Sequence, residues 1–189
     1  MVRNKTRNTR QMLDVIESVI KEKYIPAEQL QMVERKTGGR RDSMACHIDR
    51  KHEEVLLCSF DERGNNNKLF PYFKEVSGFV SMSDYVLFVE DEDSLFVFSI
   101  DLKDSAHSPK QQTMLARTFA EFIINRIKTI FGESAFSKTI QYRQIGIKTT
   151  CFKTTTKAYE NLHYDSDGYL TLLDCRRFYT RLLMDLQLL

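Results

Sequence analysis

Three residues near the middle of the chain have the types and the spacing to hold a metal ion and to act on a phosphate. Asp84 precedes the apolar run YVLFVE, and Asp101 and Lys103 stand near the end of the apolar run SLFVFSIDLK. Paired carboxylates supply the oxygen ligands that Mg²⁺ and Mn²⁺ take in proteins. A lysine beside them can position or activate a water and stabilise the charge that develops on an attacked phosphate. The three residues therefore predict a metal site with a catalytic lysine, provided that the fold brings them together.

The two apolar runs predict the strands that position these residues. Residues 84–90 and 94–102 are rich in β-branched and aromatic side chains, and the acidic run between them is too charged to be buried, so it is the turn of a hairpin. A pairing centred on that turn places Asp84 opposite Asp101, with Cβ atoms about 5 Å apart on one face. Side chains alternate along a strand, so Lys103 joins the same face.

The same residues have a purely structural alternative, an Asp-Lys ion pair at an exposed strand end, which contributes little to stability. The neighbouring Phe96, Phe98 and Ile100 instead indicate a buried strand. Two like charges directly opposed on such a strand are destabilising unless something neutralises them, and this favours a metal site.

Two amphipathic helices are expected to flank the strands. Apolar residues recur at helical spacing over 9–24, with Glu17 at the border of the apolar stripe. Over 108–131, Ser108 is the expected N-cap and Pro109 the first helical residue, and Gln112 projects from near the centre of the apolar face. The buried residues predicted for this second helix are Leu115, Phe119, Phe122, Ile123, Ile127 and Ile130.

The remaining elements are strands, turns and one basic loop. After Pro26 the first helix ends, or a second short helix runs through residue 35. Strands are expected at 54–60, at 139–149 (paired onward to 150–156 as a hairpin) and at 169–173, the last after a turn at 163–168; Asp174 is then expected to cap a C-terminal helix bearing Phe178, Leu182, Leu183 and Leu186. The loop 35–41 could clamp a phosphate backbone or could be a solvated turn. Its basic residues are Arg35, Lys36, Arg40 and Arg41.

Composition indicates one folded domain over residues 1–189. The net charge of +2 is unevenly spread, because residues 1–52 and 105–189 each carry twelve basic and seven acidic residues, whereas residues 53–104 carry four basic and twelve acidic ones. A basic surface beside an acidic centre is what a phosphate-binding protein with a cation site would show, although a basic tail and a charged hairpin tip would give the same balance. The sequence has no apolar run long enough to span a membrane and no signal-peptide pattern. Its four cysteines lack a disulfide or zinc spacing, which indicates reduced thiols and a cytoplasmic protein.

The order of these features resembles the PD-(D/E)xK nuclease superfamily. Its core is a helix, a three-stranded meander, a helix and a further strand, matched here over about residues 9–149, with residues 150–189 as a C-terminal extension. Asp84 matches the first acid of the motif, and Asp101-Leu102-Lys103 matches the (D/E)-x-K. Glu17 matches a helical glutamate that often assists, and Gln112 a glutamine found in some branches. The chain departs from the motif at Ser83, where the superfamily has proline.

The resemblance implies an α/β fold with a mixed central β-sheet flanked by helices, a restriction-endonuclease-like core, followed by a C-terminal hairpin and helix. It implies a metal-dependent endonuclease that hydrolyses phosphodiester bonds of nucleic acid, DNA rather than RNA, with Mg²⁺ or Mn²⁺ held by Asp84 and Asp101 and by Glu17 as a third ligand. Lys103 would orient the attacking water and Gln112 would support it. The alternatives are an inactive nuclease-like domain that binds nucleic acid or protein, and a structural protein in which the three residues form a salt-bridge network. The oligomeric state stays open, a homodimer being one alternative.

Overall fold

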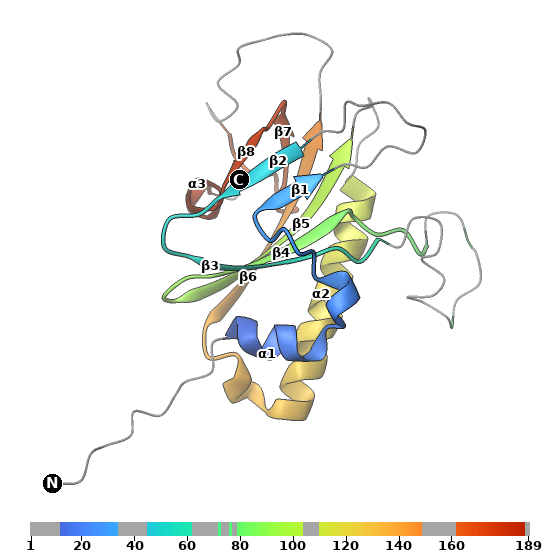
Figure 1. Cartoon of the computed structure of the whole chain (residues 1–189), viewed down its shortest axis with the longest axis vertical. Helices are drawn as coiled ribbons and strands as arrows, with labels where there is room; N and C mark the ends of the chain where they lie inside the picture. The colour runs from blue at the N-terminus through green and yellow to red at the C-terminus, as the bar shows by residue number, and fades with distance from the viewer. Residues whose placement is uncertain are drawn as a thin grey trace, which may run out of the picture.

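The computed structural model describes residues 12–33, 45–61, 72, 76, 79–103, 110–148 and 162–187. Its centre is a five-stranded mixed sheet in the order β3-β4-β5-β6-β7 (Figure 1). The strands are β3 (Glu54–Cys58), β4 (Tyr85–Glu90), β5 (Ser94–Lys103), β6 (Thr139–Lys148) and β7 (Tyr169–Leu173). The first three form an antiparallel meander, and β5, β6 and β7 run parallel to one another. The strands predicted in these regions are therefore confirmed.

The predicted register of the central hairpin is also confirmed. β4 pairs with β5 so that Tyr85 lies opposite Ile100 and Glu90 opposite Leu95. One step beyond the pair Tyr85–Ile100, this register sets Asp84 opposite Asp101. At the other end the Asp91 N–H donates to the Ser94 carbonyl over 3.0 Å, which leaves only two acidic residues at the tip. Charge keeps the tip in water, and the apolar runs bury the two strands.

The helices α1 and α2 cover the same face of this sheet. The helix α1 (Met12–Val19) is followed by a 3₁₀ turn (Glu22–Tyr24) and packs on β3 and β4, and α2 (Lys110–Phe131) packs along β5 and β6. Buried residues of both helices and of the sheet share one apolar cluster. α2 ends at Gly132, whose φ of +87° lets its N–H bond back to the Lys128 carbonyl over 2.9 Å, a helix end that glycine favours. The predicted starts of the two helices, at 9 and 108, lie outside the described residues.

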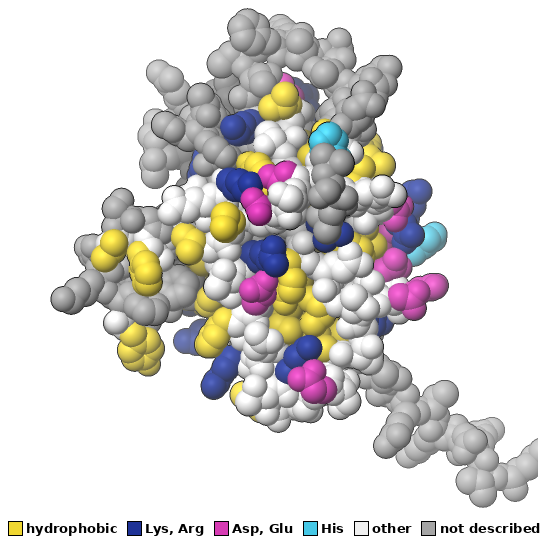
Figure 2. Space-filling view, turned by 180° about the vertical axis from the view of Figure 1, so that it is seen from behind, with side chains coloured by type: hydrophobic (Ala, Val, Ile, Leu, Met, Phe, Trp, Pro, Cys, Tyr) yellow, Lys and Arg dark blue, Asp and Glu magenta, His cyan; other side chains and the backbone are white. Residues whose placement is uncertain are grey.

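The predicted buried face of α2 is confirmed in part. Ile127 is buried, and Phe119 and Ile123 pack against the core while partly exposed. The other buried residues of the helix are mostly small: Thr113, Ala116, Ala120 and Ile124. Phe122 is 58% exposed and Ile130 is 64% exposed. Small side chains let the helix axis approach the sheet closely, so the larger ones on the neighbouring stripe remain outside. Seen from behind, apolar side chains gather on the surface among scattered basic and acidic ones (Figure 2).

A second layer covers the other face of the central sheet. It consists of a small mixed sheet in the order β1-β2-β8, with strands β1 (Gln31–Val33), β2 (Ala45–Asp49) and β8 (Arg177–Tyr179), and the short helix α3 (Thr180–Asp185). Its core residues cluster with the apolar face of β4, β5, β6 and β7. The structure describes three cysteines, Cys46, Cys58 and Cys175, and all three are free thiols.

One alternative and two expectations for this layer were wrong. Residues 31–33, for which a short helix through residue 35 was one of two alternatives, form a strand because Met32 is buried against the central sheet. Phe178, expected in the C-terminal helix, lies in β8, which pairs in parallel with β2. Asp174 has a φ of +50° and stands before β8, so it does not cap a helix.

The expected C-terminal hairpin is not seen in the described residues. Its second strand, 150–156, lies outside them, and the neighbour of β6 over Gln144–Lys148 is the parallel strand β7. The architecture is therefore mixed α/β, with two helices on one face of the central sheet and a second sheet on the other. No helix in the described ranges is long and apolar enough to cross a membrane.

Candidate metal centre

The alternation of β5 separates its apolar residues from its polar ones. Phe98, Ile100 and Leu102 pack into the cluster shared with the second sheet. Ser99, Asp101 and Lys103 therefore face the side covered by α2. The last two stand where β5 ends, beside the start of β4, so the strand carries a buried acid and a lysine to the edge of the core.

The Asp84 carboxylate is directed toward β5 by a hydrogen bond. Backbone pairing of the hairpin reaches Tyr85, and beyond it Asp84 Oδ2 accepts the Leu102 N–H over 2.7 Å. On its other side, Ser59 Oγ donates to the Asp84 carbonyl over 3.0 Å. The residue before β4 is thus held between β3 and β5, with its charge on the strand that carries Asp101.

Asp101 is a buried carboxylate whose described polar contact is an ion pair with Lys103. It is 1% exposed, and neither of its oxygens accepts a well-oriented hydrogen bond in the part of the chain that the structure describes. Its Oδ2 forms an ion pair with Lys103 Nζ at 3.0 Å. Burial and the charge of Asp84 raise the pKa of Asp101 to about 7, although Lys103 acts in the opposite direction. The neighbouring Ser99 hydroxyl is also buried without a hydrogen-bond partner among the described residues.

These groups fit a small hard cation. Mg²⁺ commonly uses one or two protein carboxylates and completes its shell with waters and substrate phosphates. A buried carboxylate opposed by a second carboxylate is a donor set of this kind. A cation there would neutralise the repulsion that now raises the pKa of Asp101.

The proposed third ligand does not join this pair as a cluster. Among the described residues, no three His, Cys, Asp or Glu side chains converge in a way that could hold a metal ion. Glu17 is exposed on α1, and its charge adds to burial in raising the pKa of the Cys58 thiol to about 12. Cys58 ends β3 at the same end of the sheet as Asp84. The role of Glu17 as a ligand stays a prediction.

Of the other candidate residues, the structure describes Gln112 but not the basic residues of the loop 35–41. Gln112 is half-buried in the first turn of α2, at the margin of the face that contacts the sheet. Its supporting role stays a prediction. Arg35, Lys36, Arg40 and Arg41, expected to hold nucleic acid, lie outside the described residues.

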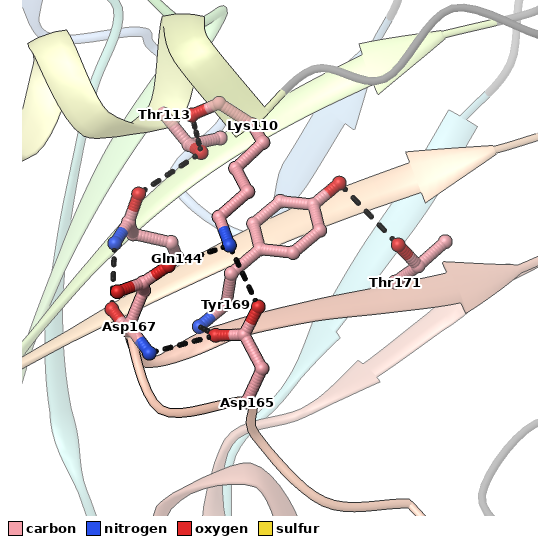
Figure 3. A network of polar contacts seen from close by, with 7 residues as sticks. All are labelled: Lys110, Thr113, Gln144, Asp165, Asp167, Tyr169 and Thr171. Carbon is pink, nitrogen blue, oxygen red and sulfur yellow. Dashed lines mark hydrogen bonds and ion pairs between the residues drawn. The ribbon is translucent and has the colours of Figure 1, made fainter.

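A polar network ties the start of α2 to β6 and β7 (Figure 3). Lys110 Nζ forms ion pairs with Asp165 at 2.8 Å and with Asp167 at 2.7 Å, in the turn that precedes β7. Beneath it, the Gln144 amide donates to the Asp167 carbonyl over 2.9 Å, and Thr113 Oγ1 donates to Gln144 Oε1 over 3.3 Å. The network fixes the start of α2 to Gln144 of β6 and to the turn at the amino end of β7.

Two residues of the site were not singled out from the sequence. Ser99 precedes Asp101 by two positions, so strand alternation alone would have placed it on the same face. Lys148 is paired with Lys103 in the parallel register of β5 and β6. Aligning the two apolar runs SLFVFSIDLK and TIQYRQIGIK end to end would have revealed this neighbour.

Comparison of the chain with protein families, with curated proteins and with solved structures finds no match. The arrangement of Asp84, Asp101 and Lys103 is therefore the ground on which a function can be inferred.

Proposed function

We propose that this protein is a metal-dependent nuclease that hydrolyses phosphodiester bonds of nucleic acid. The observation that carries the proposal is the Asp101 carboxylate, which is 1% exposed, lies opposite Asp84, and has Lys103 Nζ at 3.0 Å as its ion-pair partner. Burying such a charge costs free energy that a purely structural role does not recover. Sites that bind metal and substrate are where such groups concentrate.

The chemistry is divided among a few side chains. Asp84 and Asp101 would hold Mg²⁺ or Mn²⁺, with Glu17 as a further ligand. The bound ion would act as a Lewis acid on the phosphate and lower the pKa of a bound water. The Lys103 ammonium group would donate hydrogen bonds to that water and to the phosphate oxygen on which charge develops, and Gln112 would help to orient it.

The arrangement of elements supports the same proposal. The described helix α1, the meander β3-β4-β5, the helix α2 and the parallel strand β6 follow the order of the PD-(D/E)xK core. DNA is the proposed substrate in preference to RNA, with the loop 35–41 on its backbone. The free thiols Cys46, Cys58 and Cys175 are consistent with a proposed cytoplasmic location. For the oligomeric state, we propose a homodimer.

The test is incubation with single- and double-stranded DNA and RNA, in Mg²⁺, Mn²⁺ or EDTA. We expect cleavage that requires the divalent cation and that Asp101→Asn lowers by at least about 10²-fold, the scale on which single catalytic groups act. Asp93→Asn is the matched control, because Asp93 is exposed at the tip of the same hairpin. Equal cleavage by wild type and by Asp101→Asn at matched purity would mean a contaminating nuclease and would remove the assignment.

A second candidate is a nuclease-like domain that binds nucleic acid without cutting it. The observation that favours it is the Lys103 ion pair, which already offsets one carboxylate, in a site where no three-ligand group is formed by the described residues. Retained binding of nucleic acid in the absence of any cleavage, in all three cation conditions, would support this candidate over the nuclease.

A further inference from the structure

The α2 face of the parallel strands is a regular grid of residues around Asp101. The register of β5, β6 and β7 places side chains in three rows that rise toward the carboxyl ends of the strands. The rows are Ser99–Gln144–Tyr169, Asp101–Gly146–Thr171 and Lys103–Lys148–Leu173. Neighbouring strands lie about 4.8 Å apart, so Lys148 is the immediate neighbour of Lys103 on the same face.

The two lysines differ in what they contact. Lys103 pairs with Asp101, whereas no ion pair of Lys148 is formed within the described ranges. Lys148 is half-buried at the end of β6, next to the half-exposed Leu173 of β7. Two ammonium groups side by side repel each other unless an anion lies between them or beside them.

A glycine lies next to Asp101 in the middle row. Gly146 is buried between Asp101 of β5 and Thr171 of β7, and it brings no side chain to the middle row. A glycine inside a strand often marks a place where another group approaches the backbone closely. The strand β6 therefore contributes no side chain next to Asp101, and its next residue on this face is Lys148.

The position of each lysine decides which phosphate it could reach. Lys103 is held on Asp101 at 3.0 Å, beside the candidate metal site. It would serve the phosphate bound there, which leaves Lys148 for the next one along the strand.

We propose that Lys148 binds the nucleic-acid phosphate adjacent to the one that is attacked, and so positions the strand without taking part in the chemistry. The inference rests on the proposed nuclease function for its ligand. It assigns the two lysines separate tasks, phosphate binding to Lys148 and transition-state stabilisation to Lys103.

The experiment compares Lys148→Gln, Lys148→Arg and Lys103→Met with wild type. The control is Lys51→Gln, an exposed lysine at the opposite end of the central sheet. Binding of a fluorescein-labelled DNA strand and its duplex is followed by anisotropy in EDTA over a series of salt concentrations, and KM and kcat are measured in Mg²⁺. Melting curves check that each variant is folded.

For Lys148→Gln we expect KM to rise about three- to thirtyfold with kcat within twofold of wild type. The slope of log K against log salt should fall in magnitude by about 0.7 for the single strand or 0.9 for the duplex, one phosphate contact. Lys148→Arg should restore most of the binding, Lys51→Gln should change neither quantity, and Lys103→Met should lower kcat instead.

The outcomes separate this inference from the function on which it rests. A wild type that cuts DNA, with a Lys148→Gln variant of unchanged KM and salt slope, would overturn the role of Lys148 and leave the nuclease standing. A loss of kcat alone in that variant would also overturn it. A wild type that binds without cutting, with the slope reduced by Lys148→Gln, would support the phosphate contact and remove the nuclease. A wild type that neither binds nor cuts would overturn both.

Discussion

At the scale of single residues, the cost of burying Asp101 can be measured without knowing the substrate. A carboxylic acid removed from water and placed opposite a second carboxylate holds its proton more tightly than it does in the unfolded chain. Burial and Asp84 therefore raise the pKa of Asp101 to about 7, against an ordinary value near 4. The ion pair with Lys103 reduces this effect without removing it.

The first prediction follows from the sign of that shift. Between the unfolded and the folded pKa, the folded protein binds one more proton than the unfolded chain, so raising the pH removes a proton at the expense of the folded state. In EDTA, the free energy of unfolding should therefore decrease from about pH 4 to about pH 7, by at most about 1.4 kcal/mol per pH unit from this group. Above that range, Asp101 should add no further slope.

Urea unfolding of wild type and Asp101→Asn at a series of pH values measures this contribution. The asparagine cannot titrate, so the difference between the two proteins should grow across this range and then level off. Subtraction also cancels the histidines, which titrate in both proteins. The carboxyls of Glu53 and Asp165 have lowered pKa values and act with the opposite sign, at a pH below their ordinary range, where stability is lost as they take up protons. Parallel curves for the two proteins would show that Asp101 is ionised normally.

At the scale of elements, hydrogen bonds attach α2 to the parallel strands next to the candidate site. Gln144 is 2% exposed and connects the helix to the turn before β7 through Thr113 and the Asp167 carbonyl. Its amide stands one row below Asp101 on the same face. Gln144 therefore does more than occupy volume in the core, because its side chain hydrogen-bonds both to α2 and to the turn before β7.

The second prediction concerns this connection. Gln144→Leu preserves much of the side-chain volume but leaves the Asp167 carbonyl without its donor and Thr113 without one acceptor. We expect the free energy of unfolding to fall by about 1–3 kcal/mol, the cost of leaving buried polar groups unpaired. Gln111→Leu, at an exposed position of α2, should stay within about 0.5 kcal/mol of wild type. Equal stability of the two variants in urea titrations would contradict the structural role of Gln144.

The secondary-structure elements differ in how well the sequence predicts them. The hairpin was predictable because its two strands are neighbours in the chain and its acidic tip fixes the register. That register sets Asp84 opposite Asp101. The small sheet was not, because Met32, Cys46 and Phe178 come together from distant segments and each strand is too short to show a period. The buried face of α2 was misassigned at Phe122 and Ile130, because alanines that pack closely carry a weaker apolar signal than large side chains.

At the scale of the whole molecule, two layers enclose one sheet, and the candidate site lies where that sheet meets the start of α2. The helices and the second sheet bury β5 on both faces, which explains why its run of residues is apolar throughout its middle. Carboxylates at the end of such a strand are coupled to the cooperative unfolding of the core. A ligand for them should therefore change the stability of the entire protein.

The last prediction uses this coupling. A ligand that binds only the folded state stabilises it by RT ln(1 + [L]/Kd), about 2.7 kcal/mol at a hundredfold excess over Kd. Mg²⁺ or Mn²⁺ should therefore raise the melting temperature of wild type and of the control Asp93→Asn. Asp101→Asn should lose this response, and in EDTA it should melt no lower than wild type, because it removes one of two opposed charges at nearly constant shape. In a purely structural salt bridge the order reverses: the substitution deprives Lys103 of its partner, the melting temperature in EDTA falls, and metal has no effect. A destabilised Asp101→Asn together with a wild type that does not respond to metal would leave Asp84, Asp101 and Lys103 as a structural network.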